Sequence, residues 1–180
     1  AYNPRKMKQH DIQVRGAGIV GQSLALALSR LGLRVALVRD AAPAAASVDV
    51  RAYALNARSV ALLRSLKVWD GLPAGAATPV HDRRIAGDAD GAVLEFGAWE
   101  QRVSELAWIV DAPVLERELA AAVRFAPHIT VTDAPVEAAL TALCEGKHSA
   151  TRDALGVSFE RLPYGHQAIA ARLVASQPHQ

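Results

Sequence analysis

The chain has 180 residues, 51% of them hydrophobic, and its 20 Lys and Arg against 18 Asp and Glu leave a formal net charge of +2. This composition argues against a disordered chain, and the length suits one domain or one large part of a longer protein. No run of basic residues exceeds the pair Arg83-Arg84, so we expect no nucleic-acid partner.

The first predicted elements form a βαβ unit. We predict a strand that begins at Ile12, a helix that ends at Gly32, and a second strand over residues 35–38 that is apolar throughout and therefore buried on both faces. Five apolar side chains share the helix face that we expect to be buried: Val20, Leu24, Ala27, Leu28 and Leu31. Residues 1–7 precede this unit and are predicted to be a leader or added residues.

The remaining elements suggest further α/β structure with one antiparallel addition. Asn56 is expected to cap a helix, and residues 83–86 and 92–96 are expected to form a hairpin around the turn GDADG. Other elements are predicted in this order: a strand over 106–110, a helix with Pro113 in its first turn, and strands over 129–132 and 138–144. Residues 167–176 fit either a helix or a strand, because their alanines favour helix while their larger apolar residues alternate.

A glycine-rich loop joins the first strand to the first helix. Gly16, Gly18 and Gly21 form the pattern GxGxxG, in which the first glycine permits a tight turn, the second lets the backbone approach a pyrophosphate, and the third lets the helix pack closely on the strand. The helix N-terminus, at Ile19 and Val20, offers unpaired N–H groups to phosphates. The loop therefore predicts a dinucleotide site.

The end of the second strand leaves the nature of the dinucleotide open. A dinucleotide-binding strand of this kind ends in an acid that binds the ribose, whereas here Val38 is followed by Arg39 and then Asp40. Arg39 could pair with the 2′-phosphate of NADP, or Asp40 could take the role of the acid. A third interpretation is that both side chains are solvated and the ribose contact is lost.

Several segments in order carry a family resemblance. RGAGIVGQSLALALSRLGLRVALV, AWIVDAPVLERELAAAV, CEGKHSATRDALGV and YGHQAIAARLVASQPH together resemble the ubiquinone-biosynthesis hydroxylases (2-polyprenylphenol hydroxylase type) of the FAD-dependent class A aromatic monooxygenases. The third segment is similar to the family's DG motif, GADGxxSxVRxxLG. The resemblance implies a Rossmann-like FAD-binding βαβ domain with an added β hairpin, a truncated version of the p-hydroxybenzoate-hydroxylase-like fold.

The resemblance also implies a cofactor, a reductant and site residues. FAD would be held by the glycine loop, with NAD(P)H as reductant, and Arg51 matches a family arginine that reaches the flavin cofactor. Glu145 and Gly146 stand at the Asp-Gly of the DG motif. Arg39 replaces the family acid, and Ala112 stands where relatives often have an amide side chain.

The resemblance suggests a domain division and partners. Residues 8–160 are expected to form the FAD/NAD(P)-binding domain with a hairpin insertion at about 80–98, and residues 161–180 to begin the sheet of a substrate domain. A later GD motif of the family has no counterpart in the 180 residues, so a truncated half is expected. A polyprenylated phenol is the implied small-molecule partner, with peripheral membrane contact and a homo-oligomer as further expectations.

The predicted function is therefore an FAD-dependent aromatic-ring hydroxylase, here as an FAD-binding half, with no catalytic residue assigned. The alternatives are a non-catalytic nucleotide-binding or interaction domain and an NADP-dependent dehydrogenase, the latter disfavoured by the DG-like segment. Six scattered His and one Cys give no metal-ligand spacing. Cys144 as the only cysteine fits a reducing compartment, from which we expect a cytoplasmic location, and no apolar stretch approaches the ~20 residues of a membrane-spanning helix.

Overall fold

The structure of the chain is a computed structural model that describes residues 9–39, 49–167, 169, 171, 173 and 176. Within this part of the chain the helices and strands are β1 (His10–Arg15), α1 (Ile19–Arg30), β2 (Val35–Val38), β3 (Ala52–Leu55), α2 (Ala57–Ser65), the 3-10 turn η1 (Trp69–Gly71), β4 (Ala77–Val80), β5 (Asp82–Ala86), β6 (Val93–Gly97), β7 (Ala107–Asp111), α3 (Ala112–Phe125), β8 (Ile129–Thr132), β9 (Ala138–Leu143), the 3-10 turn η2 (Gly146–His148) and α4 (Ala150–Ala154).

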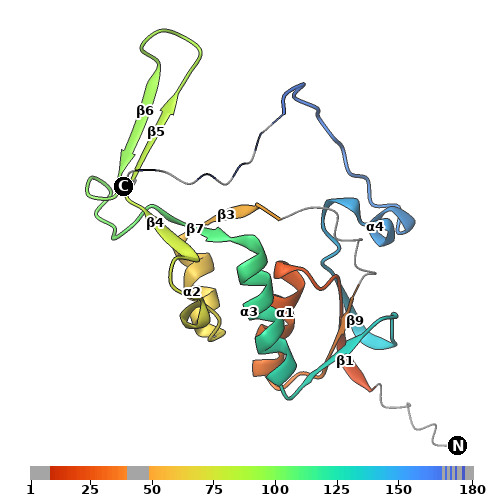
Figure 1. The fold of residues 1–180 in the computed structure, drawn as a ribbon. Coiled ribbons are helices and arrows are strands. Elements are labelled where there is room, and N and C mark those ends of the chain that lie inside the picture. Colours follow the sequence, from red (N-terminus) through yellow and green to blue (C-terminus); the bar gives the residue numbers. More distant parts are fainter. Residues whose placement is uncertain are drawn as a thin grey trace, which may run out of the picture.

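A parallel sheet organises the part of the molecule that carries the glycine loop. Its strands lie in the order β8-β2-β1-β9, and Val14 of β1 stands opposite Leu37 of β2 and Ala142 of β9. Helix α1 packs against this sheet, and α3 lies beside α1 (Figure 1). Val14, Leu37, Leu115 and Leu119 are no more than 1% exposed between the sheet and the two helices. The parallel α/β arrangement and the fully buried β2 confirm the predicted fold class.

The buried face of α1 differs from the predicted one. Val20 and Leu31 are 68% and 76% exposed, whereas the helix buries Gly21, Ala25 and Ser29. These small residues allow the helix to lie close to the sheet and to α3, and Leu26, which the prediction left out, is the large apolar side chain that the helix buries. The three other positions of the predicted face are only partly buried: Leu24, Ala27 and Leu28.

A second, antiparallel sheet lies beside α2 and leads into α3. It has the strand order β3-β7-β4, and β7 runs directly into α3, which has Pro113 in its first turn as predicted. Asn56 caps α2 as predicted, because its Oδ1 accepts a hydrogen bond from the Ser59 N–H at 2.9 Å. The rings of Trp69 and Trp108 meet edge to face, with centroids 5.3 Å apart, and join η1 to β7.

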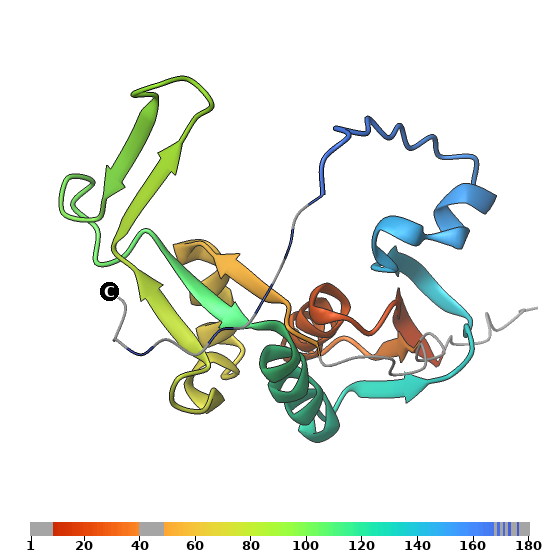
Figure 2. The same ribbon diagram turned by 45° about the horizontal axis from the view of Figure 1, so that its top comes forward.

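The predicted hairpin is also present, as a separate two-stranded sheet of β5 and β6. It projects away from the helices and the parallel sheet (Figure 1). After α4 the chain leaves as an open stretch (Figure 2), and the described residues beyond Ala154 lie in no helix or strand. Of residues 167–176 only 167, 169, 171, 173 and 176 are described, so the expected helix or strand falls largely outside the described residues and stays a prediction.

Candidate functional site

An open cleft of about 660 Å³ lies where β1 and β9 end. Its lining includes most of the residues that the sequence predicts for a cofactor site, namely Gly16, Gly18, Ile19, Val20, Arg51, Glu145 and Gly146. The lining also contains residues that the sequence analysis did not select: Tyr53, Leu55, Leu115, Glu116 and Cys144. The fold thus gathers segments from four distant parts of the chain at the carboxyl end of the parallel sheet, where α/β proteins bind ligands.

The three glycines of the loop have different surroundings. Gly16 has φ +99°, and a Cβ there would lie 2.6 Å from the carbonyl carbon of Cys144. A Cβ on Gly21, which lies behind the loop, would collide with the carbonyl oxygen of Gly16. A Cβ on Gly18, in contrast, would meet no heavy atom within 4 Å. Gly16 and Gly21 are therefore required by the protein's own backbone, whereas Gly18 leaves free space on the cleft side.

The N-terminus of α1 faces the cleft without a side-chain cap. Gly18 is the N-cap residue, no acidic side chain lies in the first turn, and the first helical hydrogen bond runs from the Gln22 N–H to the Gly18 carbonyl at 2.9 Å. The N–H groups of Ile19 and Val20 thus have no partner within the helix, and they carry the positive end of its dipole. This geometry suits an anionic group such as a phosphate.

Gln22 stabilises the loop and was missed by the sequence analysis. Its side chain is 6% exposed, and its Nε2 donates a hydrogen bond of 2.8 Å to the carbonyl of Ala17. The signal in the sequence was a polar residue inside an apolar helix, one position after the last glycine of the motif. A buried amide in such a place needs an internal partner, and here the partner is the loop backbone.

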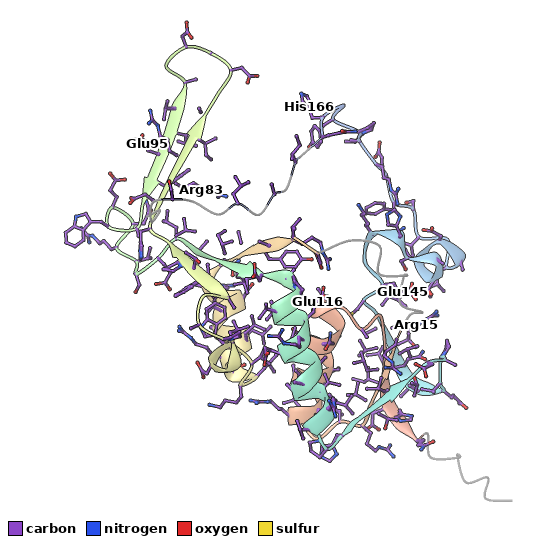
Figure 3. All side chains as sticks on the ribbon, in the orientation of Figure 1. Arg15, Arg83, Glu95, Glu116, Glu145 and His166 are labelled. Atoms are coloured by element: carbon purple, nitrogen blue, oxygen red, sulfur yellow. The ribbon has the colours of Figure 1, made fainter. Side chains whose placement is uncertain are left out.

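Glu145 of the DG-like segment is held by the protein itself. Figure 3 shows its side chain beside that of Arg15, and the Arg15 Nε lies 3.1 Å from the Glu145 Oε1. Ser149 Oγ donates to Oε2 at 2.6 Å, and Thr151 Oγ1 donates to Oε1 at 2.7 Å. Burial raises the pKa of the Glu145 carboxyl, but these hydrogen bonds and the charge of Arg15 outweigh that effect, so its pKa lies below the ordinary value.

The network of Glu145 joins two segments of the chain next to the cleft. Arg15 is the residue before the glycine loop, and Ser149 and Thr151 lie at the start of α4. The carboxylate side chain is only 8% exposed, so it orients these segments more than it faces the cleft. Gly146, the next residue, has φ +76° and free space around its Cα, so the backbone at this point can lie close to a ligand.

Arg51 places a cation on the opposite wall of the cleft. It immediately precedes β3, and its guanidinium is shared between two carboxylates, with Nη2 2.7 Å from the Asp49 Oδ2 and 3.3 Å from the Glu116 Oε1. The hydrogen bonds between Arg51 and Asp49 lower the pKa of the Asp49 carboxyl to about 2. The cleft therefore has a helix N-terminus on one side and a guanidinium on the other.

Arg39 and Asp40 are not brought into this arrangement. Arg39 lies at the end of β2, where its Nη2 is 2.8 Å from the Asp133 Oδ1, and it is absent from the residues that line the cleft. Asp40 falls outside the described residues. The three interpretations of this pair therefore stay predictions, although an exposed pair with Asp133 would compete with any 2′-phosphate for Arg39.

The described residues hold no arrangement typical of metal or covalent chemistry. No group of three or more His, Cys, Asp or Glu among them could hold a metal ion. Burial raises the pKa of the Cys144 thiol, which disfavours the thiolate that a nucleophile needs. None of the helices in the described part of the chain is long and apolar enough to cross a membrane.

Comparison with protein families and curated proteins agrees with this geometry. Residues 9–122 match the model of the FAD binding domain family. The 3-demethoxyubiquinol 3-hydroxylase of Escherichia coli K12 is 34% identical over 125 residues, which are 67% of this chain and 32% of that protein. The ubiquinone hydroxylase UbiL of Rhodospirillum rubrum is 26% identical over 196 residues, covering 96% of this chain and 45% of that protein.

Solved structures show the same fold at lower identity. The p-nitrophenol 4-monooxygenase PnpA of Pseudomonas putida DLL-E4 superimposes with a TM-score of 0.64 at 18% identity, covering 85% of this chain and 45% of that one. PqsL of Pseudomonas aeruginosa in complex with 2-aminobenzoylacetate gives a TM-score of 0.66, also at 18% identity, over 86% of this chain and 48% of that one. The chain thus spans less than half the length of each of these proteins.

Proposed function

Because this chain belongs to the FAD binding domain family, we propose that its cleft binds FAD and that the chain is the flavin-binding part of an aromatic-ring hydroxylase. The diphosphate of FAD would lie at the N-terminus of α1, against the N–H groups of Ile19 and Val20 and beside Gly18. Arg51 would supply a positive charge from the other wall. Gly146 would allow close approach of the ligand to the backbone.

One observation supports this proposal most strongly. The cleft combines free space at Gly18 with an uncapped helix N-terminus and a guanidinium, while Gly16 and Gly21 are packed against the backbone. A glycine turn that served only to connect a strand and a helix would need the two packed glycines but not the open one. The open glycine at the helix N-terminus therefore favours a nucleotide diphosphate over an incidental turn.

The proposed roles of the protein are binding, orientation and exclusion of water. FAD supplies the redox chemistry when bound, with NAD(P)H as the reductant and molecular oxygen as the source of the hydroxyl group. The residues of the cleft would hold the diphosphate and position the cofactor. Glu145, through its bonds to Arg15, Ser149 and Thr151, would fix the two loops that border the cofactor.

The substrate and the setting are proposals drawn from the relatives. One relative is named a 3-demethoxyubiquinol 3-hydroxylase and another a ubiquinone hydroxylase, so we propose a polyprenylated phenol as the substrate of the complete enzyme. We further propose that residues 8–160 form the FAD-binding domain and that residues 161–180 belong to a substrate domain. A cytoplasmic location, with peripheral membrane contact or self-association, completes the proposal.

The test is a separate titration of the purified chain with FAD and with NADPH. We expect FAD to bind at one site, as measured by quenching of flavin fluorescence, with a shifted flavin absorbance spectrum. Oxygen consumption with NADPH would then show whether the chain turns over by itself. Tight binding of NADPH without FAD would overturn the proposal in favour of an NADP-dependent dehydrogenase, and binding of neither would favour a non-catalytic interaction domain.

A further inference from the structure

Arg51 is the guanidinium of the cleft wall, and protein acceptors already surround it. Its Nε donates to both carboxylate oxygens of Asp49, at 2.9 and 3.1 Å, and its Nη2 donates to Asp49 at 2.7 Å and to Glu116 at 3.3 Å. Its Nη1 donates to the Tyr53 hydroxyl at 3.4 Å. A phosphate that approaches Arg51 must therefore compete with groups of the protein.

Glu116 is the competitor that lies in the cleft. It is on α3 and lines the cleft together with Arg51, whereas Asp49 is not among the lining residues. Figure 3 shows Glu116 at the end of α3 that lies toward β3. Its side chain is 35% exposed, and its 3.3 Å contact is the longer of the two carboxylate contacts to the Arg51 Nη2. Glu116 is thus the carboxylate that an incoming anion meets and that Arg51 can release most easily.

The negative charge of Glu116 has the same sign as the anionic ligand that the α1 N-terminus and Arg51 would attract. The α1 N-terminus and Arg51 both attract an anion, whereas a carboxylate in the same cleft repels one. Glu116 shares the guanidinium of Arg51 with Asp49. A diphosphate has to displace Glu116 and then remains close to its negative charge.

We propose that Glu116 is an internal anion that competes with the diphosphate of FAD for Arg51 and thereby weakens the affinity of the cleft. The inference rests on the proposed FAD site. It assigns to Glu116 the role of an affinity-setting residue, with Asp49 holding Arg51 in place whether or not the ligand is bound. Exposed ion pairs contribute up to about 1 kcal/mol, so the loss of this competition should tighten FAD binding roughly two- to fivefold.

The experiment compares the FAD dissociation constants of the 180-residue chain and four variants. Glu116→Gln keeps the shape of the side chain and removes its charge, and it is expected to lower the dissociation constant. Glu118→Gln is the matched control, because Glu118 lies on the same helix, pairs with Arg117 and does not line the cleft. Arg51→Gln is expected to weaken binding, and in the double variant Arg51→Gln/Glu116→Gln the gain from Glu116→Gln should shrink. Circular dichroism of each variant establishes that the fold is retained.

The outcomes separate the inference from the proposed function. If the unaltered chain binds FAD and Glu116→Gln leaves the dissociation constant unchanged or raises it, the competition is overturned while the FAD site stands. A raised constant would show instead that Glu116 holds the ligand. If Glu116→Gln lowers the FAD dissociation constant equally with and without Arg51, the proposed competition is also overturned, since general charge repulsion would explain the result. If neither the unaltered chain nor any variant binds FAD, the inference and the proposed function both fail.

Discussion

The two walls of the cleft are built by different means. The glycine wall, formed by Gly16 and Gly18 with Gly21 behind them, depends on backbone shape, since Gly16 and Gly21 have no room for a Cβ and Gly18 borders open space. The ionic wall, formed by Arg51 and Glu116 with Asp49 paired to Arg51 outside the lining, depends on exposed or half-exposed charges. Packed backbone cannot move away from an added Cβ, whereas an exposed charge that loses its partner can be hydrated by water. Changes in the glycine wall should therefore lower the free energy of unfolding far more than changes in the ionic wall.

The largest loss of stability is expected for Gly21→Ala in the glycine wall. Alanine in a helix is favoured over glycine by about 1 kcal/mol, so helix propensity alone predicts a stabilised protein. The new Cβ would instead collide with the carbonyl of Gly16, and overpacking against rigid backbone costs about 1 to 3 kcal/mol or more. We expect a net loss of about 2 kcal/mol in the free energy of unfolding, measured by urea denaturation. A variant as stable as the unaltered chain would show that the glycine wall is less tightly packed than the structure indicates.

Glu145→Ala tests a charge that does not behave like those of the ionic wall. The carboxylate is 8% exposed and accepts bonds from Arg15, Ser149 and Thr151, so its removal leaves these donors without their acceptor. We expect a loss of about 1 to 2 kcal/mol in the free energy of unfolding, because a polar group left buried without a partner costs about that much. Glu145→Gln, which keeps one acceptor oxygen, is expected to lose less. Equal stability of all three proteins would place Glu145 with the weakly stabilising charges of the ionic wall.

The stability of the unaltered chain and that of Glu145→Gln should also depend differently on pH. The pKa of the Glu145 carboxyl in the folded protein lies below its ordinary value of 4.5, so the ionised form stabilises the fold. This contribution is fully present above the unfolded-state pKa and is lost as the pH falls through the folded-state pKa. The stability difference between the unaltered chain and Glu145→Gln should therefore be constant near neutral pH and shrink below about pH 4.5. A difference that grows on acidification would contradict the assigned direction.

The backbone features of the glycine wall could be predicted from the sequence because they are local. GxGxxG needs only a strand before it and a helix after it, and β2 and the cap at Asn56 likewise follow from short stretches of residues. The gathering of Arg51 and Glu145 at the same cleft came from the family resemblance, not from spacing. The hydrophobic pattern placed the buried face of α1 only in part, because the helix buries Leu26 together with the small residues Gly21, Ala25 and Ser29, whereas Val20 and Leu31 are exposed.

The pairing of Arg51 with Glu116 in the ionic wall could not be predicted because it joins distant residues. Arg51 and Glu116 are 65 positions apart, and only the path from β3 through β7 into α3 brings them together. Arg39 shows the converse, since its position after β2 suggested a phosphate contact, whereas its partner in the structure is Asp133, 94 positions away. Charges near the surface have several partners within reach, and the sequence alone does not select among them.

The smallest expected change in stability, and the sharpest contrast with Gly21→Ala, comes from Gly18→Ala. Gly18 has φ −76°, which any residue adopts, and its Cβ would point into free space. Replacing an N-cap glycine by alanine costs at most about 1 kcal/mol, so the variant should fold. The added methyl group would nevertheless occupy the space that we assign to the diphosphate, and we expect FAD affinity to fall about tenfold, equivalent to about 1.4 kcal/mol. The same one-carbon change would then destabilise the fold at Gly21 and weaken FAD binding at Gly18. If Gly18→Ala binds FAD as tightly as the unaltered chain, the cofactor does not approach this glycine.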